Sequence, residues 1–88
     1  MKKVTFYHSV ICPRCQMASR SIAALQAEFP GVEIERVEFL ANRARARQAG
    51  VRQIPALVAA EGASLSSFYL TRGRIREFLE SVSRPARE

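Results

Sequence analysis

The chain contains no tryptophan and no aspartate, and only two of its 88 residues are cysteines. No apolar run reaches 18 residues, so the sequence excludes a membrane-spanning helix. Two cysteines allow at most one disulfide, which also excludes a small scaffold held together by several bridges. The start of the chain, MKKVTFYHSVIC, has two lysines but lacks the small-residue cleavage site of a secretory signal. We therefore read this start as a strand and predict a cytoplasmic protein without membrane contact.

The acidic residues are eight glutamates, against twelve arginines and two lysines, which gives a net charge of +6. The simplest interpretation is a solvated basic surface, and a sharper one is an acidic protein partner. The spacing disfavours nucleic acid as a partner, because Arg43 and Arg47 share one side of an expected helix while Arg45 points away. Aromatic residues that could stack on bases are not interleaved with these arginines.

Length and an apolar content of 48% predict one small domain with a real core, covering residues 1–88 with a frayed tail at 83–88. Alternating and apolar runs predict strands at about 3–8, 32–39, 55–60 and 65–70. Helical spacing predicts helices from Pro13 to the Pro30-Gly31 stop, between Asn42 and Gly50, and from a Thr71 N-cap onward. In the second strand the apolar alternation slips by one residue at Arg36, which predicts an edge strand with a bulge.

The order strand, helix, strand, short helix, strand, strand, helix predicts an α/β fold. Its first strand–helix–strand unit forms a parallel crossover, and the next two strands form an antiparallel hairpin. The expected architecture is a four-stranded mixed sheet with helices on both faces.

The two cysteines stand in the motif Cys12-Pro13-Arg14-Cys15. A disulfide across so short a loop adds little stability, so the spacing favours redox or metal chemistry over a structural bridge. Pro13 suits the first position of a helix, which places Cys12 at the N-cap. The helix dipole and the Arg14 charge there favour a thiolate, so Cys12 is expected to attack and the more enclosed Cys15 to resolve.

The motif after the first strand, Ile54-Pro55 opening the third, and the last amphipathic helix together resemble the thioredoxin fold in its glutaredoxin-like form. The resemblance covers nearly the whole chain and implies thiol–disulfide exchange with protein or glutathione disulfides. It also implies a cis Pro55 beside the dithiol, which leaves the Ile54 backbone to bind an extended peptide or glutathione. No tightly bound cofactor is expected, and the reductant is glutathione or a thioredoxin-reductase-type donor.

The chain differs from glutathione-using members of this family at three places. Arg14 replaces the usual aromatic residue, YHSVI replaces a segment with lysine, and FYLTRGRI replaces a Gly-Gly turn. We therefore expect weak glutathione binding and exchange with protein disulfides, including acidic ones. The candidate substrate-binding residues are Pro13, Arg14, Ile54, Pro55, Thr71 and Arg72, with Arg52 nearby.

Two other functions stay open at this point. Cys12, Cys15 and His8 could contribute to a metal site, but a tetrahedral structural zinc needs four ligands, so the sequence predicts no metal. An iron–sulfur cluster shared by two protomers, or a binding module that does not use its dithiol, are the remaining alternatives. His8, which ends the first strand, is interpreted as a partly buried structural residue, with tuning of the thiolate as the alternative.

Overall fold

The computed structural model describes residues 2–66 and 70–83. Its elements are β1 (Lys2–His8), α1 (Pro13–Gln26), β2 (Val32–Glu38), the 3₁₀ turn η1 (Leu40–Asn42), α2 (Arg43–Gln48), β3 (Ala56–Ala59), β4 (Ser64–Ser66) and α3 (Arg72–Ser83). Ser83, which was expected to begin the tail, is instead the last residue of α3. The remainder of that tail, 84–88, and positions 67–69 of the expected fourth strand lie outside the described residues.

The four strands form one mixed sheet in the order β2-β1-β3-β4. β1 pairs with β2 in parallel and with β3 antiparallel, and β3 and β4 form the antiparallel hairpin. The expected topology is therefore confirmed. Because β1 lies between β2 and β3, its backbone is hydrogen-bonded on both sides.

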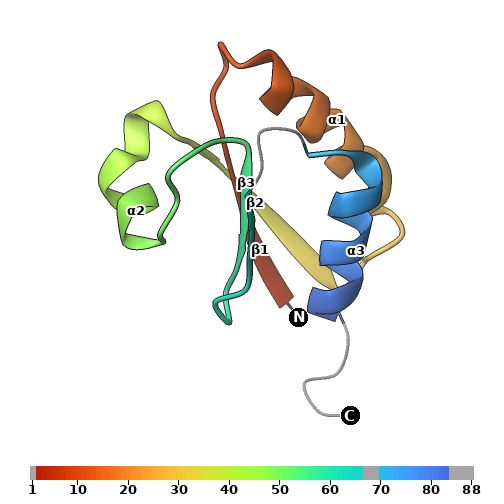
Figure 1. Cartoon of the computed structure of the whole chain (residues 1–88). Helices are drawn as coiled ribbons and strands as arrows, with labels where there is room; N and C mark the ends of the chain where they lie inside the picture. The colour runs from red at the N-terminus through yellow and green to blue at the C-terminus, as the bar shows by residue number, and fades with distance from the viewer. Residues whose placement is uncertain (1, 67–69, 84–88) are drawn as a thin grey trace.

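Helices cover both faces of the sheet, with α1 and α3 on one side and α2 on the other (Figure 1). The larger core lies under α1 and α3, where Val4 and Phe6 of β1 are fully buried with Ile22 and Ile75. The smaller core lies under α2 and includes Tyr7 of β1. Alternate residues of β1 therefore serve opposite cores, as the pleat of a strand requires.

β2 is an edge strand, as expected, but it has no bulge. Its register with β1 runs one to one from Lys2 opposite Val32 to His8 opposite Glu38. Val32 packs in the larger core and Val37 in the smaller one. The slip in the apolar pattern at Arg36 therefore marks the point where the buried residue of the strand changes from one face to the other.

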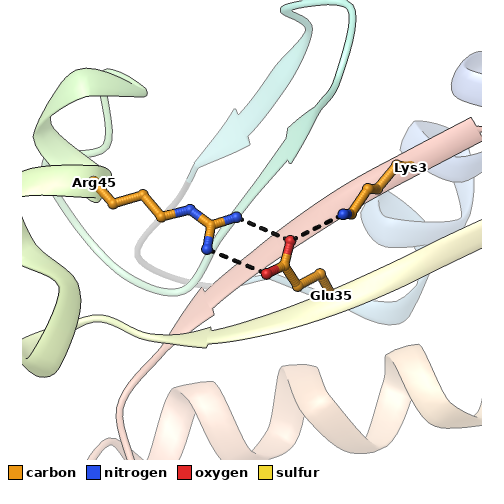
Figure 2. A network of polar contacts seen from close by, with 3 residues as sticks. All are labelled: Lys3, Glu35 and Arg45. Atoms are coloured by element: carbon orange, nitrogen blue, oxygen red, sulfur yellow. Dashed lines mark hydrogen bonds and ion pairs between the residues drawn. The ribbon is translucent and has the colours of Figure 1, made fainter.

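Glu35 of β2 joins the sheet to α2 (Figure 2). The Arg45 guanidinium donates to both oxygens of Glu35, with Nη2–Oε1 at 2.9 Å and Nη1–Oε2 at 3.2 Å. Lys3 Nζ lies 3.5 Å from Glu35 Oε1. The Arg45 hydrogen bond is the main cause that lowers the pKa of Glu35 below its usual value. Arg45 thus faces the sheet while helping to hold the short helix against it.

Two of the expected helix ends are confirmed, but α1 ends at Gln26, before the expected Pro30-Gly31 stop, so Phe29 lies outside the helix. The Thr71 hydroxyl accepts a hydrogen bond from the Arg74 N–H at 3.3 Å and caps α3. Gly50 follows α2 with φ of 81°, a left-handed conformation that favours glycine. Asn42 occupies the N-cap position of α2, but its side chain donates to the Glu38 carbonyl instead of capping the helix. Within the described residues, no helix combines the length and apolar character needed to cross a membrane.

Replacing Ile22 by alanine should strongly destabilise the protein. Ile22 is fully buried in the larger core, and such truncations cost about 2–5 kcal/mol. Met17 on the same helix is 53% exposed, so Met17→Ala should change the free energy of unfolding by less than about 0.5 kcal/mol. Urea denaturation of both variants measures the difference, and equal losses would contradict the assigned packing of α1.

Candidate functional site

Three strand ends meet where the two cysteines lie. The parallel register places Glu38, the last residue of β2, opposite His8, the last of β1. The antiparallel register places Ala56, the first residue of β3, opposite Tyr7. Residues that follow β1 and residues that precede β3 are therefore brought to the same edge of the sheet, although they are separated by about forty positions in the sequence.

Cys12 is the N-cap residue of α1, as expected. Its backbone is extended, with φ of −105° and ψ of 108°, and its Sγ accepts a hydrogen bond from the Cys15 N–H at 3.1 Å. Pro13 follows as the first helical residue, a position whose N–H has no acceptor within the helix, so its missing N–H costs no hydrogen bond. A thiolate accepts such a hydrogen bond more strongly than a thiol does. The helix start therefore places a backbone donor against the Cys12 sulfur.

Cys15 lies one turn further along α1 and is the more enclosed of the two free thiols. It is 1% exposed, whereas Cys12 is 9% exposed. Burial, followed by the hydrogen bond with Cys12, raises the pKa of Cys15 to about 12, and a backbone hydrogen bond at Ser9 and the Arg14 charge only partly oppose this. The two sulfurs thus lie in different environments, and Cys15 is the more enclosed, as expected.

Arg14 connects the cysteine motif to the loop before β3. Its Nη2 donates to the Ile54 carbonyl at 3.4 Å, and the Ile54-Pro55 peptide bond is cis, as the resemblance implied. The structure corrects one expectation here, because the Ile54 carbonyl already accepts a hydrogen bond from within the chain. An incoming peptide that uses this carbonyl must share it with the guanidinium or displace it.

Exposed apolar side chains lie next to Cys12. Val10 is 68% exposed and Ile11 is 77% exposed, although both are large and apolar. Pro13 is exposed as well, whereas Pro55 is buried. The attacking sulfur is therefore bordered by apolar surface on its N-terminal side.

Thr71 and Arg72 lie at the start of α3, where both are exposed. The Thr71 hydroxyl is engaged in capping that helix. Arg52, also exposed, precedes the Ile54-Pro55 bond by two residues. Roles for these three residues in binding a partner stay predictions.

A pocket of about 230 Å³ lies beside Cys15 and is lined by His8, Ser9, Val10, Cys15, Gln16 and Ser19. The sequence analysis missed Ser9, which is 3% exposed. Its carbonyl accepts from the Cys12 N–H at 3.2 Å and its hydroxyl from the Ile11 N–H at 3.4 Å. A serine three residues before an N-cap is a signal for such a turn. Ser9 therefore shapes the loop that presents Cys12.

A metal site at this end of the sheet would require several ligand side chains close to one another. Among the described residues, no group of three or more histidine, cysteine or glutamate side chains is arranged to hold a metal ion. Within the described chain, then, Cys12, Cys15 and His8 do not form such a ligand set.

In the folded, reduced protein, iodoacetamide at pH 7 should modify Cys12 well before Cys15. Cys15 is buried, and its raised pKa keeps it protonated far above neutral pH. Mass spectrometry of peptides from briefly treated protein measures the order of labelling, and urea-unfolded protein, in which both thiols react alike, is the control. Faster labelling of Cys15 in the folded protein would show that the assignment of the two sulfurs is wrong.

Comparison with known proteins agrees with this geometry. No family model matches the chain. A curated thioredoxin from Methanocaldococcus jannaschii is 30% identical over 57 residues, which cover 64% of this chain and 67% of the relative.

Solved structures show the same fold at low sequence identity. A mutant thioredoxin from Halobacterium salinarum superposes with a TM-score of 0.80 at 22% identity, covering 97% of this chain and 77% of that chain. Thioredoxin O2 from Arabidopsis thaliana gives 0.78 at 20% identity, with 96% and 76% covered. Thioredoxin from Trypanosoma brucei brucei gives 0.77 at 24% identity, with 93% and 74% covered. The chain therefore belongs to the thioredoxin-fold superfamily, and thiol–disulfide exchange is the chemistry that this membership supports.

Proposed function

We propose that this protein is a dithiol redoxin that reduces disulfides of other proteins by exchange with Cys12 and Cys15. The observation that carries the proposal is the difference between the two sulfurs. Cys12 accepts a backbone hydrogen bond at the start of α1, while Cys15 is enclosed and holds its proton. Cys12 is thereby suited to be the attacking cysteine and Cys15 the resolving one.

The reaction takes place in two exchanges. The Cys12 thiolate attacks one sulfur of a target disulfide, which forms a Cys12–target bond and releases the other target sulfur as a thiolate. Cys15 then loses its proton and attacks Cys12 Sγ, which forms the Cys12–Cys15 disulfide and releases the second target thiolate. The target gains two electrons, the protein loses two, and an external reductant returns it to the dithiol state.

The surface around Cys12 supports a protein substrate. Val10 and Ile11 are large apolar side chains that contact little of the chain itself, and such surface suits an apolar flank of a polypeptide better than a small charged tripeptide. An extended target segment would lie against the Ile54-Pro55 loop and use the Ile54 backbone in a strand-like interaction. The net charge of +6 favours acidic segments.

Arg14 is well placed to respond to such a segment. It donates to the Ile54 carbonyl, and a guanidinium can exchange one carbonyl acceptor for a target carboxylate, with which it forms stronger charge-assisted hydrogen bonds. We infer that an acidic target draws Arg14 away from the Ile54 carbonyl, which leaves this carbonyl free to accept a hydrogen bond from the backbone of the same target.

Cys15→Ser should trap a mixed disulfide between Cys12 and a target, because the serine hydroxyl cannot resolve it. Cys12→Ser should remove exchange altogether, since the buried Cys15 has neither the thiolate nor the exposure to replace it. Non-reducing electrophoresis with an oxidised protein substrate separates the species. Wild-type turnover in Cys12→Ser would contradict the mechanism.

The reductant can be identified by running two recycling systems in parallel with the same protein disulfide. Turnover should be faster with NADPH and thioredoxin reductase than with glutathione and glutathione reductase, because the chain lacks the Gly-Gly turn that lets backbone approach the tripeptide. Consumption of NADPH measures both reactions, and omission of the protein is the control. Faster turnover with glutathione would place the protein with the glutathione-dependent redoxins.

A further inference from the structure

The second exchange needs a group that takes the proton of Cys15. Burial is the main cause that raises the pKa of Cys15 in the dithiol form, and it still disfavours the Cys15 thiolate when Cys12 is bonded to a target. In the mixed disulfide Cys12 is bonded to the target and cannot serve as the base. Arg14 is a cation and cannot accept a proton. A base within reach of Cys15 would therefore speed this step.

The pocket beside Cys15 offers such a group. Among its described lining residues, only His8 and Cys15 have side chains that titrate between pH 4 and 12. Ser9, Gln16 and Ser19 supply polar atoms on the same walls. The volume of about 230 Å³ is several times the roughly 30 Å³ that one water molecule occupies in the liquid. The pocket therefore has room for a short chain of water between the thiol and the imidazole.

The surroundings of His8 keep the imidazole neutral. Partial burial, followed by the Arg36 charge, lowers the pKa of His8, and the Glu38 charge opposes them. Arg36 and Glu38 both belong to β2, the neighbouring side chain on β1 is the uncharged Phe6 ring stacked at 5.2 Å, and the facing positions of β3 and its loop, Ala56 and Pro55, are uncharged. A neutral imidazole has a lone pair free to accept a proton at neutral pH.

We propose that His8 is the proton acceptor for Cys15 in the resolving step and acts through water in this pocket. The inference rests on the proposed function. As Cys15 Sγ forms its bond to Cys12 Sγ, the thiol proton passes to His8, the Cys12–target bond breaks, and its electron pair leaves with the target thiolate. The imidazolium then returns its proton to solvent or to the departing thiolate. Electrons and protons balance with the target as the oxidant.

Glu38 is the other base near this end of the sheet, but it serves another purpose. Its Oε1 accepts from the Ala41 N–H at 2.9 Å, and this hydrogen bond is the main cause that lowers the pKa of Glu38. Glu38 is absent from the residues that line the pocket. Its carboxylate does interact with Ser9 and Val10 of that lining, but its lowered pKa makes it a weak base. We therefore assign Glu38 an effect through its charge on His8 and no proton transfer.

The test uses one equivalent of 5,5′-dithiobis(2-nitrobenzoate) with the reduced protein in a stopped-flow instrument. Attack by Cys12 releases the first coloured thiolate, and resolution by Cys15 releases the second, so the two steps are read separately. Dilution should leave the rate of the second phase unchanged, which excludes resolution by another molecule. In the wild type this rate should rise with pH to a plateau, with an inflection below 6.5, the ordinary pKa of histidine.

His8→Gln should leave the first phase unchanged and slow the second by about 100-fold at pH 7, the lower end of the usual effect of a general base. The plateau should disappear, and the rate should keep rising with pH as Cys15 itself ionises. A variant with an unchanged second phase and pH profile would overturn the proposal. Loss of the first phase in the wild type would count against the proposed function itself.

Two charge variants test the His8 imidazole without replacing it. They keep the proposal testable if the His8 variant fails to fold. Arg36 lowers the pKa of His8, so Arg36→Gln should move the inflection of the second phase to higher pH. Glu38 raises that pKa, so Glu38→Gln should move the inflection to lower pH. Opposite shifts support His8 as the titrating group, and an inflection that stays in place in both variants would overturn the assignment.

Discussion

The central position of β1 is the constraint on which the rest of this structure depends. Pairing on both edges fixes its register with β2 and β3. Burial of Val4 and Phe6 on one face and of Tyr7 on the other fixes which side chains point to each face of the sheet. A shift by one residue would exchange the two faces and expose both cores. Because the cysteine loop leaves directly from the end of this strand, the same constraint determines where Cys12 is presented.

The dithiol works through a difference in environment between two identical side chains. The two cysteines are three positions apart in the sequence, which is almost one helical turn. Cys12 lies at the N-terminal end of α1, among N–H groups that the helix leaves unpaired, while Cys15 is almost fully buried. The Cys15 N–H donates to Cys12 Sγ, so the backbone of the resolving residue stabilises the attacking one. Because Cys15 is enclosed, its thiol proton has to be removed before Cys15 can resolve the mixed disulfide.

Several of the arginines make separate contacts within the described residues. Arg45 holds α2 to the sheet through Glu35, and Arg36 lies over the Phe6 ring at 5.7 Å. Arg14 joins the cysteine motif to the Ile54 carbonyl. Two of these charges also act on the site: after burial, Arg36 is the second cause that lowers the pKa of His8, and Arg14 partly opposes the raised pKa of Cys15.

The sequence by itself determined the element order, the N-cap position of Cys12, and the α/β fold, because short-range spacing and proline chemistry are local properties. It could also place Pro55 at a strand start. Only the tertiary structure decided that β2 has no bulge. Both faces of this edge strand are covered, so the slip at Arg36 reflects a change in which face is buried and not an extra residue. The Arg14–Ile54 contact and the pocket shared by His8 and Cys15 likewise needed the fold. Both depend on strand register, which brings together residues that no local pattern relates.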